Sequence, residues 1–398
     1  MNFTPLDTLA TQLKALDAQG LRRQRHSTET PCDVRMVVDG RELLAFNSND
    51  YLGLASHPQV IEALKEGVSL YGAGSGASHL ISGHSQAHDR LEELLAACLS
   101  PHLPCATALY FSSGYMANLG VLTALAAAAP HDIAFFSDRL NHASLIDGIR
   151  LSRVPCHIYN HADVDDLSRQ LATCSNGTKV VVTDGVFSMD GDIAPLPDLL
   201  RVCEEHGAWL LVDDAHGFGV LGDTGAGILQ HFNLQSSQLI YIGTLGKAAG
   251  VAGAFVAAHE HLMAWMLQRA RPYIYTTAAP AALAHALLTS VRIMRSDEGR
   301  RRRVHLQTLV QQLSSAPVPP AWQRWATSTT PIQPLVLGSN ENVLKASAAL
   351  LEQGIWISAI RAPTVPVNTA RLRITLSANH TAEDVHHLVQ ALARAAQT

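Results

Sequence analysis

YIGTLGKAAGVAGAF, residues 241–255, places one lysine, Lys247, among glycine, alanine and threonine, with no carboxylate inside the stretch. Lysines are usually solvated surface charges and seldom lie in runs of small apolar residues. Small neighbours allow a bulky, flat molecule to come close to the chain. A desolvated amine loses part of its preference for the charged form and then attacks carbonyls. The stretch therefore indicates a Schiff-base lysine, with a structural lysine at the end of a strand as the alternative.

The apolar run before Lys247 is one of a series along the chain. The runs are short, continuous and bounded by polar turns, and helical patterns separate several of them. This arrangement is typical of a largely parallel sheet covered on both faces, and so of an α/β fold. The predicted strands are Ala108–Phe111, Ile133–Phe136, Val180–Thr183, Trp209–Val212, Leu239–Ile242 and Ala254–Ala257.

The pattern also predicts three parts of the chain. An N-terminal helix and arm occupy residues 1–50, because Thr4-Pro5-Leu6-Asp7 has the order of a helix start. A large domain with the mixed, mostly parallel sheet follows at 51–282. Residues 283–398 form a smaller α+β domain, in which a helical, arginine-rich segment precedes αβ units such as Pro334–Leu337 and Arg371–Leu376.

Composition limits the classes of function. The chain has 398 residues, of which 16% are charged, and a net charge of −5, which gives nucleic-acid binding no electrostatic support. The N-terminus lacks the order of a signal peptide, and the apolar stretches are too short to span a bilayer. The cysteines have neither CxxC spacing nor another metal-binding pattern, which favours buried thiols in the reducing cytoplasm. They are Cys32, Cys98, Cys105, Cys156, Cys174 and Cys203.

Polar clusters follow four of the predicted strands, and ligands of parallel α/β sheets bind beyond the carboxyl ends of strands. Asp213 and His216 follow one strand, where a carboxylate can hold a protonated ring nitrogen or simply cap a loop. Gly114 and Tyr115 open a helix after another strand. Free N–H groups at such a helix start bind phosphate, and Tyr115 can stack on a ring, although an ordinary capped helix is the alternative.

Two further clusters carry weaker signals. His142 follows a third strand, where a histidine is often only a satisfied surface residue. The segment Asp184–Asp192, with Ser188, follows a fourth strand and can serve only as turns. Taken together, the clusters provide a phosphate cradle, a ring-stacking histidine, a carboxylate for a pyridinium nitrogen and a Schiff-base lysine. These are the groups that pyridoxal phosphate requires, and we therefore predict this cofactor and no metal.

With these motifs the chain resembles the α-oxoamine synthases, pyridoxal-phosphate enzymes of the aspartate-aminotransferase fold. The resemblance extends over nearly the whole chain. Its most specific pieces are Asn49–Leu54, Asp184–Asp192, Val212–Gly219, Thr244–Lys247 and Ala359–Pro366. One departure is His79, which stands in the glycine-rich loop where the family carries glycine or arginine.

The resemblance implies a role for each matching residue. Lys247 forms the Schiff base, Asp213 pairs with the pyridine nitrogen, His142 stacks on the ring, and His216 and Ser188 lie near its O3′ side. Thr244 and the backbone at Gly114 and Tyr115 hold the phosphate. On the substrate side, Arg361 takes the amino-acid carboxylate, Arg22 and Thr364 face the acyl substrate, and His142 also contacts the substrate. The catalytic residues implied are Lys247, His142, Asp213 and His216.

The stretch Ala359–Pro366 favours the members that condense L-alanine with a pimeloyl thioester, carried by coenzyme A or by acyl carrier protein, and release CO₂. A sister synthase that uses glycine or serine, or a different acyl coenzyme A, is the first alternative. An aminotransferase and a catalytically silent binding protein are the others. The resemblance further implies a homodimer with shared active sites.

Overall fold

The structure is a computed structural model that describes residues 4–320, 322–324 and 328–397. It divides into two compact units. One contains residues 50–188 and 192–304, and the other contains 1–49, 189–191 and 305–398. The N-terminal arm thus belongs with the C-terminal part. The segment 283–304, expected to open the small domain, belongs to the larger unit because its first helix packs on two helices near residues 58–99.

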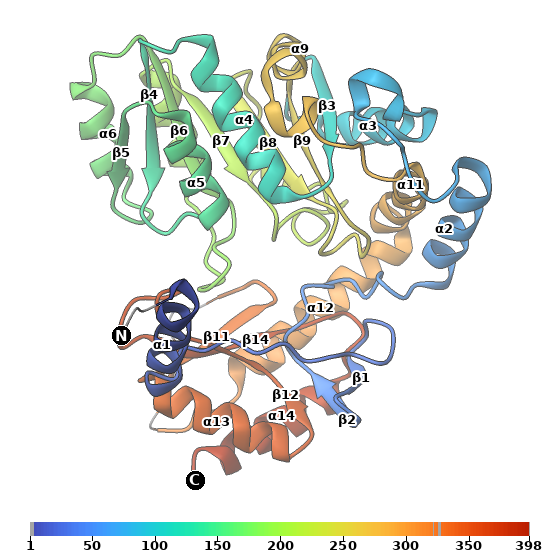
Figure 1. The fold of residues 1–398 in the computed structure, drawn as a ribbon, viewed down its shortest axis with the longest axis vertical. Helices are drawn as coiled ribbons and strands as arrows, with labels where there is room; N and C mark the ends of the chain where they lie inside the picture. The colour runs from blue at the N-terminus through green and yellow to red at the C-terminus, as the bar shows by residue number, and fades with distance from the viewer. Residues whose placement is uncertain (1–3, 321, 325–327, 398) are drawn as a thin grey trace. The chain divides into compact units, whose positions relative to one another are not determined.

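The larger unit is built on a seven-stranded sheet with the order β3-β9-β8-β7-β6-β4-β5, traced through the described residues (Figure 1). Neighbouring strands from β8 to β5 are parallel, and β9 runs antiparallel to both β3 and β8. The strands are β3 (Ala106–Phe111), β4 (Ile133–Asp138), β5 (Cys156–Tyr159), β6 (Thr178–Asp184), β7 (Trp209–Asp213), β8 (Leu239–Thr244) and β9 (Ala254–His259).

The larger unit also contains a set of helices. They are α2 (Pro58–Tyr71), α3 (Gln86–Leu99), α4 (Gly114–Ala128), α5 (Ala143–Ser152), α6 (Val164–Thr173), α7 (Leu196–Glu205), α8 (Ile228–His231), α9 (Glu260–Arg269), α10 (Arg271–Ile274) and α11 (Ala281–Arg295), with the π-helical turn η1 (His79–Gly83) before α3. Helix α12 (Asp297–Ser315) follows α11 and runs from the larger unit into the smaller one.

The main core lies between one face of the sheet and helices α4, α5, α9 and α10. Its strands contribute alternate residues, such as Val180 and Val182 of β6, while Val181 between them is buried as well. Both faces of the sheet are therefore covered, which explains the continuous apolar runs in the sequence. Helix α4 is rich in alanine, and a Cβ at Gly148 of α5 would lie 2.7 Å from Leu122, so these two helices cross closely.

The smaller unit contains two sheets, with the strand orders β1-β2-β12 and β10-β11-β14-β13 in the described residues. Strand β2 pairs antiparallel with β1 and parallel with β12. The strands are β1 (Arg35–Val38), β2 (Arg41–Ala45), β10 (Gln323–Arg324), β11 (Ile332–Gly338), β12 (Ile355–Trp356), β13 (Ser358–Ile360) and β14 (Ala370–Thr375). Helices α13 (Asn340–Glu352) and α14 (Ala382–Ala395) complete it, and Arg371 is buried in an ion pair with Asp190.

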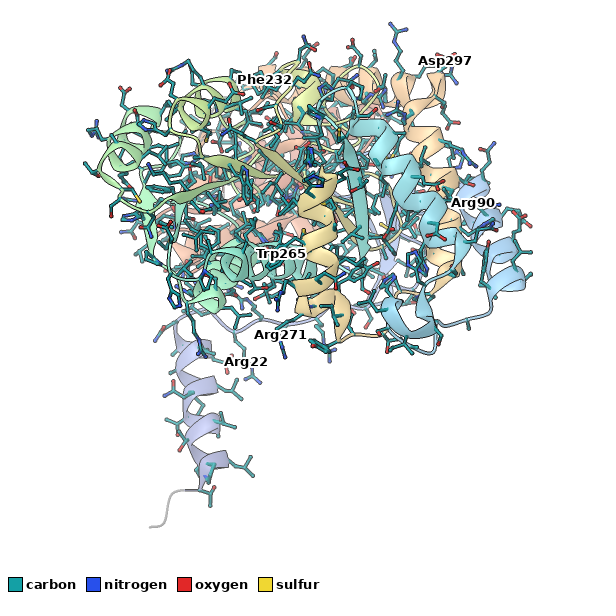
Figure 2. The ribbon with its side chains drawn as sticks, turned by 90° about the horizontal axis from the view of Figure 1, so that it is seen from above. Arg22, Arg90, Phe232, Trp265, Arg271 and Asp297 are labelled. Carbon is teal, nitrogen blue, oxygen red and sulfur yellow. The ribbon has the colours of Figure 1, made fainter. Side chains whose placement is uncertain are left out.

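Helix α1 (Pro5–Ala18) begins as the sequence predicts, with Thr4 and Asp7 forming a capping box. None of its residues is buried, and side chains stand out along its length (Figure 2). The six predicted strands and the α/β fold class are confirmed. The predicted helical segment 283–316 is two helices that meet at Ser296. In the part of the chain that the structure describes, no helix is both long and apolar enough to cross a membrane.

Candidate active site

The polar clusters that follow the strands come together at one edge of the larger sheet. In the sheet register Asp184 of β6 lies beside Asp213 of β7, and Asp213 lies beside Ile242 of β8, which leads to Thr244. A cavity of about 210 Å³ opens there. Its lining consists of Gly114, Tyr115, Asn118, His142, Ser144, Asp184, Ser188, Asp213, Ala215, His216, Thr244 and Lys247.

Lys247 lies in a tight turn between β8 and β9. The Leu245 N–H donates to the Gly253 carbonyl at 2.8 Å, and the Gly250 N–H donates to the Lys247 carbonyl at 2.8 Å. Gly250 has a φ of +69°, and a Cβ there would lie 2.4 Å from the backbone nitrogen of Ala55. Small residues are thus required by the turn itself, as well as by the space in front of the lysine.

The lysine amine is part of a row of three polar groups. Lys247 Nζ lies 2.9 Å from His216 Nε2, and His216 Nδ1 lies 2.5 Å from the Tyr51 hydroxyl. When Nδ1–H donates to Tyr51, Nε2 has a lone pair that accepts from Lys247; the other tautomer accepts from Tyr51 and donates to a neutral amine. The imidazole therefore couples the protonation of Lys247 to the tyrosine hydroxyl.

Asp213 is a buried carboxylate, and protein groups donate hydrogen bonds to both of its oxygens. The Asn118 amide donates to its Oδ2 at 2.7 Å, and the Ala215 N–H donates to its Oδ1 at 3.0 Å. Asp214, the next residue, accepts instead from Tyr241 and from the Ile228 N–H, both at 2.7 Å, and burial raises its pKa to about 7. The sequence offers both carboxylates, but only Asp213 lines the cavity.

The first turn of α4 forms another wall of the cavity. Ser113 caps this helix by accepting a hydrogen bond from the Met116 N–H at 3.3 Å, and Gly114 and Tyr115 are its first two residues. The N–H groups of a first helical turn have no partner within the helix and carry a partial positive charge. This end of the cavity is therefore suited to an anion such as phosphate.

His142 caps helix α5, and both its backbone and its ring are held. Its N–H donates to Asp184 Oδ2 at 2.7 Å, and its Nδ1 lies 2.6 Å from the Ser144 hydroxyl. Burial lowers the pKa of the imidazole, and Lys247 acts in the same direction, whereas the charge of Asp213 opposes them. Burial and the charge of Asp213 also raise the pKa of Asp184. Both groups therefore tend toward their neutral forms.

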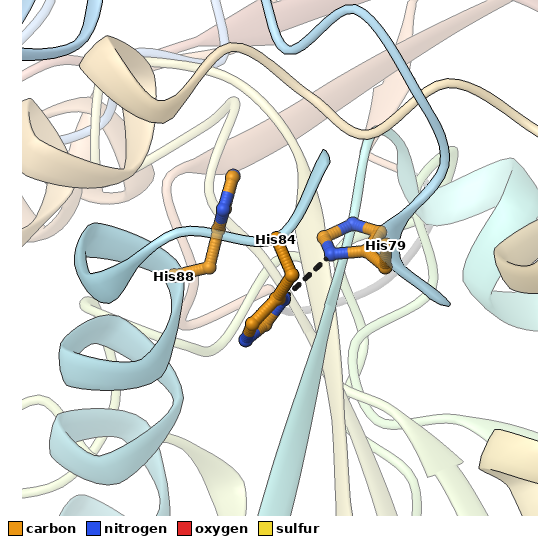
Figure 3. A group of neighbouring side chains, drawn as sticks. All are labelled: His79, His84 and His88. Carbon is orange, nitrogen blue, oxygen red and sulfur yellow. Dashed lines mark hydrogen bonds between the residues drawn. The ribbon is translucent and has the colours of Figure 1, made fainter. Parts of the chain in front are cut away.

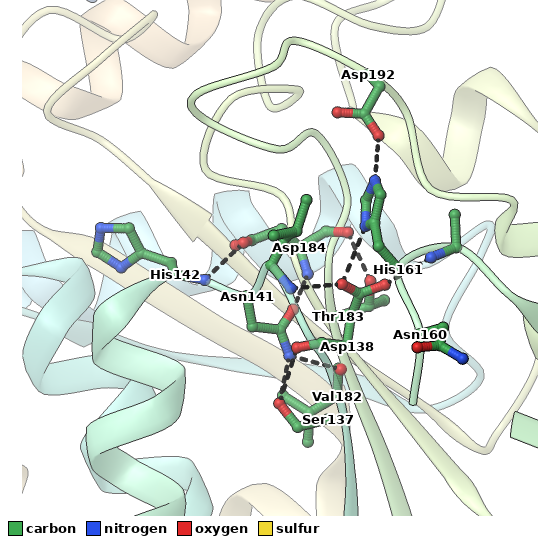
Figure 4. Close-up of polar contacts among 12 residues, drawn as sticks. Ser137, Asp138, Asn141, His142, Asn160, His161, Val182, Thr183, Asp184 and Asp192 are labelled. Atoms are coloured by element: carbon green, nitrogen blue, oxygen red, sulfur yellow. Dashed lines mark hydrogen bonds and ion pairs between the residues drawn. The ribbon is translucent and has the colours of Figure 1, made fainter. Parts of the chain in front are cut away.

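A network of hydrogen bonds holds the strand ends beneath His142 (Figure 4). The Asn141 amide donates to the Val182 carbonyl at 2.8 Å, and its oxygen accepts from the Asp184 N–H at 2.9 Å. His161 bridges Asp138 and Asp192, at 3.0 and 2.9 Å. Burial alone would lower the pKa of His161, but the hydrogen bonds and charges of the two carboxylates raise it to about 10. The ring is therefore an imidazolium that ties the end of β4 to the loops that contain His161 and Asp192.

Most of the predicted site residues line this one cavity. They are Gly114, Tyr115, His142, Ser188, Asp213, His216, Thr244 and Lys247. Of the four predicted substrate residues, His142 lines the cavity, whereas Arg22, Arg361 and Thr364 belong to the smaller unit. There the Arg361 guanidinium donates to the Gly20 carbonyl, the Thr364 N–H donates to the Arg361 carbonyl at 3.0 Å, and Arg22 forms an exposed ion pair with Asp17 at 2.7 Å.

Several residues of the site have no predicted role in the sequence. Asn118 lies one helical turn after Gly114, so the two residues share a face of α4. This spacing is the sequence signal that could have identified Asn118 as a site residue. Ser144 and Asp184 form hydrogen bonds with His142. Tyr51 contacts His216, although the two residues are 165 positions apart in the sequence. Such distant contacts leave no local pattern in the sequence.

The donor set fits pyridoxal phosphate. Lys247 supplies an amine for the aldehyde, Asp213 an acceptor for a ring N–H, and the first turn of α4 a phosphate site. The Asn118 Oδ1 atom is buried and has no hydrogen-bond partner among the described residues, although its amide nitrogen binds Asp213. A bound polar molecule in the cavity would satisfy such an atom.

Comparisons with known proteins agree with this chemistry. A model of the class I and II aminotransferase family matches residues 41–392. An 8-amino-7-oxononanoate synthase from Janthinobacterium sp. (strain Marseille) is 62% identical over 384 residues, covering 96% of both chains. A structure of serine palmitoyltransferase with its PLP internal aldimine has a TM-score of 0.89 and 27% identity, covering 98% of this chain and 97% of that one. An 8-amino-7-oxononanoate synthase structure from Francisella tularensis has a TM-score of 0.74 and 30% identity, covering 88% and 97%.

The fold and the site thus define a pyridoxal-phosphate-dependent transferase of the class I and II aminotransferase family. Within that family, the chain belongs to the 8-amino-7-oxononanoate synthases, which are acyltransferases. The resemblance to the α-oxoamine synthases and the predicted cofactor are confirmed.

Proposed function

We propose that the chain condenses L-alanine with a pimeloyl thioester, on coenzyme A or acyl carrier protein, to form 8-amino-7-oxononanoate for biotin biosynthesis. A C–C bond forms between the alanine Cα and the thioester carbonyl carbon. The C–S bond breaks to release the thiol carrier, and the alanine carboxylate leaves as CO₂. The observation that supports this most directly is the cavity in which Lys247, Asp213 and His142 meet, in a chain 62% identical to a synthase of that name.

When bound, pyridoxal phosphate supplies an electron sink for a carbanion at the amino-acid Cα. In our proposal Lys247 holds the cofactor and, once displaced by the substrate, takes the proton from Cα. The carboxylate of Asp213 keeps the ring nitrogen protonated, and the Asn118 amide keeps that carboxylate oriented at 2.7 Å. His216, 2.9 Å from the lysine amine, accepts or returns a proton there.

The remaining cavity residues hold the cofactor in our proposal. Gly114 and Tyr115 offer backbone N–H groups to the phosphate, and Thr244 adds a hydroxyl on the same side. His142 packs on the ring, and its neutral form avoids a second positive charge next to Lys247. Ser188 lies with His216 on the O3′ side. We assign cofactor binding to the unit of residues 50–188 and 192–304, which contains this whole lining.

Three of the predicted substrate residues belong to the smaller unit. We propose that Arg361 binds the amino-acid carboxylate, because a guanidinium forms two parallel hydrogen bonds with a carboxylate. Arg22 and Thr364 face the acyl substrate. We also propose that two copies of the chain form a homodimer with shared active sites. A cytoplasmic location would suit the buried thiols of Cys98 and Cys203.

The proposal is tested by mixing the holoenzyme with L-alanine, glycine or L-serine, each with and without pimeloyl coenzyme A. We expect a change in cofactor absorbance with alanine, followed by equal amounts of free thiol and CO₂ when the thioester is added. A productive response to glycine or serine alone would contradict the assigned substrate and would favour a sister synthase. The Lys247→Ala variant should lose at least about a thousandfold in kcat, whereas Lys65→Ala, on an exposed helix face, should not.

Sedimentation of the holoenzyme measures its mass and so tests the homodimer. Mixing two inactive variants tests whether the active sites are shared. An inactive Lys247→Ala chain and an inactive Arg361→Ala chain should recover activity together if Lys247 and Arg361 of one site come from different subunits. A fully active monomer would contradict the proposal.

A further inference from the structure

Three histidines gather on the larger unit, outside the lining of the Lys247 cavity. His79 begins the turn η1, His84 follows that turn, and His88 lies in the first turn of α3. One ring nitrogen of each lies within 4.8 Å of the other two (Figure 3). His79 and His88 are buried, and His84 is partly exposed, so the group is reachable from solvent on one side.

The backbone is built to hold these rings together. A Cβ at Gly83 would lie 2.0 Å from the Ala77 carbonyl oxygen, and the Gly83 N–H donates to the Ser78 carbonyl at 2.9 Å, so η1 is closed tightly by a residue that must be glycine. His84 lies in extended backbone just before Ser85, the N-cap of α3, and its ring stacks on that of His88 with ring centroids 5.3 Å apart. His79 is also stacked on Tyr273, with ring centroids 4.4 Å apart.

Hydrogen bonds fix the tautomers of two of the rings. His84 Nε2–H donates to Asp89 at 2.9 Å, which leaves the lone pair on Nδ1. His88 Nδ1 accepts from the Ser85 N–H at 3.0 Å, so Nε2–H donates to the Ala279 carbonyl at 2.9 Å. A metal-binding histidine usually donates its other N–H to a carboxylate or a backbone carbonyl in this way.

His79 Nδ1 and His84 Nδ1 lie 2.8 Å apart and share a single proton in the metal-free chain.

We propose that His79, His84 and His88 bind a divalent transition-metal ion, Zn²⁺ or Ni²⁺, with water as the fourth ligand. Three imidazole nitrogens without a carboxylate suit these ions and not Mg²⁺ or Ca²⁺, which prefer oxygen. Ligands of a tetrahedral zinc ion, about 2.0 Å from the metal, lie roughly 3.3 Å apart. The 2.8 Å pair therefore opens slightly, His79 moves its proton to Nε2, and His88 Nδ1 exchanges Ser85 for the metal.

A metal ion bound at this site would stabilise the glycine-rich loop, residues 72–78, that precedes His79. The Ser75 hydroxyl donates to the Ala279 carbonyl at 2.7 Å, and the Ala278 N–H donates to the Ala77 carbonyl at 2.9 Å. His88 binds the same Ala279 carbonyl. A metal ion bridging η1 and α3 would thus tie the loop to both α3 and residues 278–279, and we expect metal binding to stabilise this part of the fold.

Titration of the untagged holoenzyme with Zn²⁺ by calorimetry, and with Co²⁺ by visible absorption, tests the site. We expect one ion per chain, a tetrahedral Co²⁺ spectrum and a higher melting temperature. Asp89→Asn removes the carboxylate that accepts from His84 and should raise the Kd for Zn²⁺ roughly 10–100-fold. His84→Gln removes a ligand, the most exposed of the three, and should raise this Kd by more than that. The control His131→Gln changes an exposed histidine elsewhere and should leave the Kd unchanged.

Two results would overturn the site. One is a Kd for Zn²⁺ that is the same in His84→Gln, His131→Gln and the parent chain, since binding would then arise at other histidines. The other is weak binding without saturation at one ion per chain. Circular dichroism and the metal-free melting temperature establish that each variant is folded, so a loss of binding in a folded His84→Gln chain is attributable to the ligand.

Discussion

Lys247 Nζ lies 2.9 Å from His216 Nε2, and the other nitrogen of that imidazole lies 2.5 Å from the Tyr51 hydroxyl. Tyr51 and His216 are both buried, which strengthens these hydrogen bonds relative to water. The row means that the protonation of the lysine depends on a group that is two hydrogen bonds away.

Removing the Tyr51 hydroxyl should therefore change the protonation of Lys247. In Tyr51→Phe the His216 Nδ1 loses its partner, so the tautomer that accepts from Lys247 is no longer favoured. We expect a decrease in kcat of about tenfold and a shift in the pH dependence of the cofactor absorbance. Tyr275→Phe is the matched control, because Tyr275 is exposed and lies outside the cavity lining. An identical pH dependence in Tyr51→Phe and the parent chain would contradict the coupling.

Asn118 should matter for the affinity of the cofactor. Asn118→Asp replaces the amide donor by a carboxylate 2.7 Å from Asp213, and Asp184 is a third acid in the same cavity. Asp213 then accepts a proton itself and no longer serves the ring nitrogen. We expect the Kd for pyridoxal phosphate to rise by at least about tenfold, or about 1.4 kcal/mol. Fluorescence titration of the apoenzyme measures this, and Ser144→Ala, which keeps the Asp213 contact, should have a smaller effect.

The strands and the identity of the cofactor could be predicted because their signals are local. Continuous apolar runs such as Val180–Thr183 reflect burial on both faces, and reactive residues such as Lys247 directly follow these runs. Strand β5 has no such signal. It is an edge strand whose first three residues are exposed, with Ile158 61% exposed, so its sequence Cys156–Tyr159 shows neither a continuous run nor a regular alternation.

The supporting residues of the site could not be predicted for a related reason. The contact of Tyr51 with His216 joins residues 165 positions apart, and that of Asn118 with Asp213 joins residues 95 apart. Asp184 has the appearance of a turn residue after a strand, and only the parallel register of β6 and β7 places it beside Asp213. Local patterns predict residues that react, whereas residues that orient them are found through the packing of the sheet.

The bridge from His161 to Asp138 and Asp192 should make stability depend on pH. The pKa of this imidazole rises from 6.5 in the unfolded chain to about 10 in the folded one, since its two carboxylate partners outweigh burial. The stabilisation is therefore complete below pH 6.5 and is lost as the pH rises toward 10. Urea unfolding should show that His161→Gln costs roughly 2–3 kcal/mol at pH 6 and much less at pH 10. A difference that is constant over this range would contradict the charged bridge.

The turn that carries Lys247 should tolerate no side chain at Gly250. This residue has a φ of +69°, and an added Cβ would lie 2.4 Å from Ala55 N and 2.5 Å from the Leu54 carbonyl carbon, which are backbone atoms that cannot rotate away. Gly250→Ala should cost more than about 2 kcal/mol in urea unfolding and lower cofactor occupancy. Gly40→Ala, with a φ of +75° and open space, separates the two effects, because it should cost only about 1 kcal/mol. Equal losses at both positions would show that the close approach to residues 54 and 55 contributes nothing.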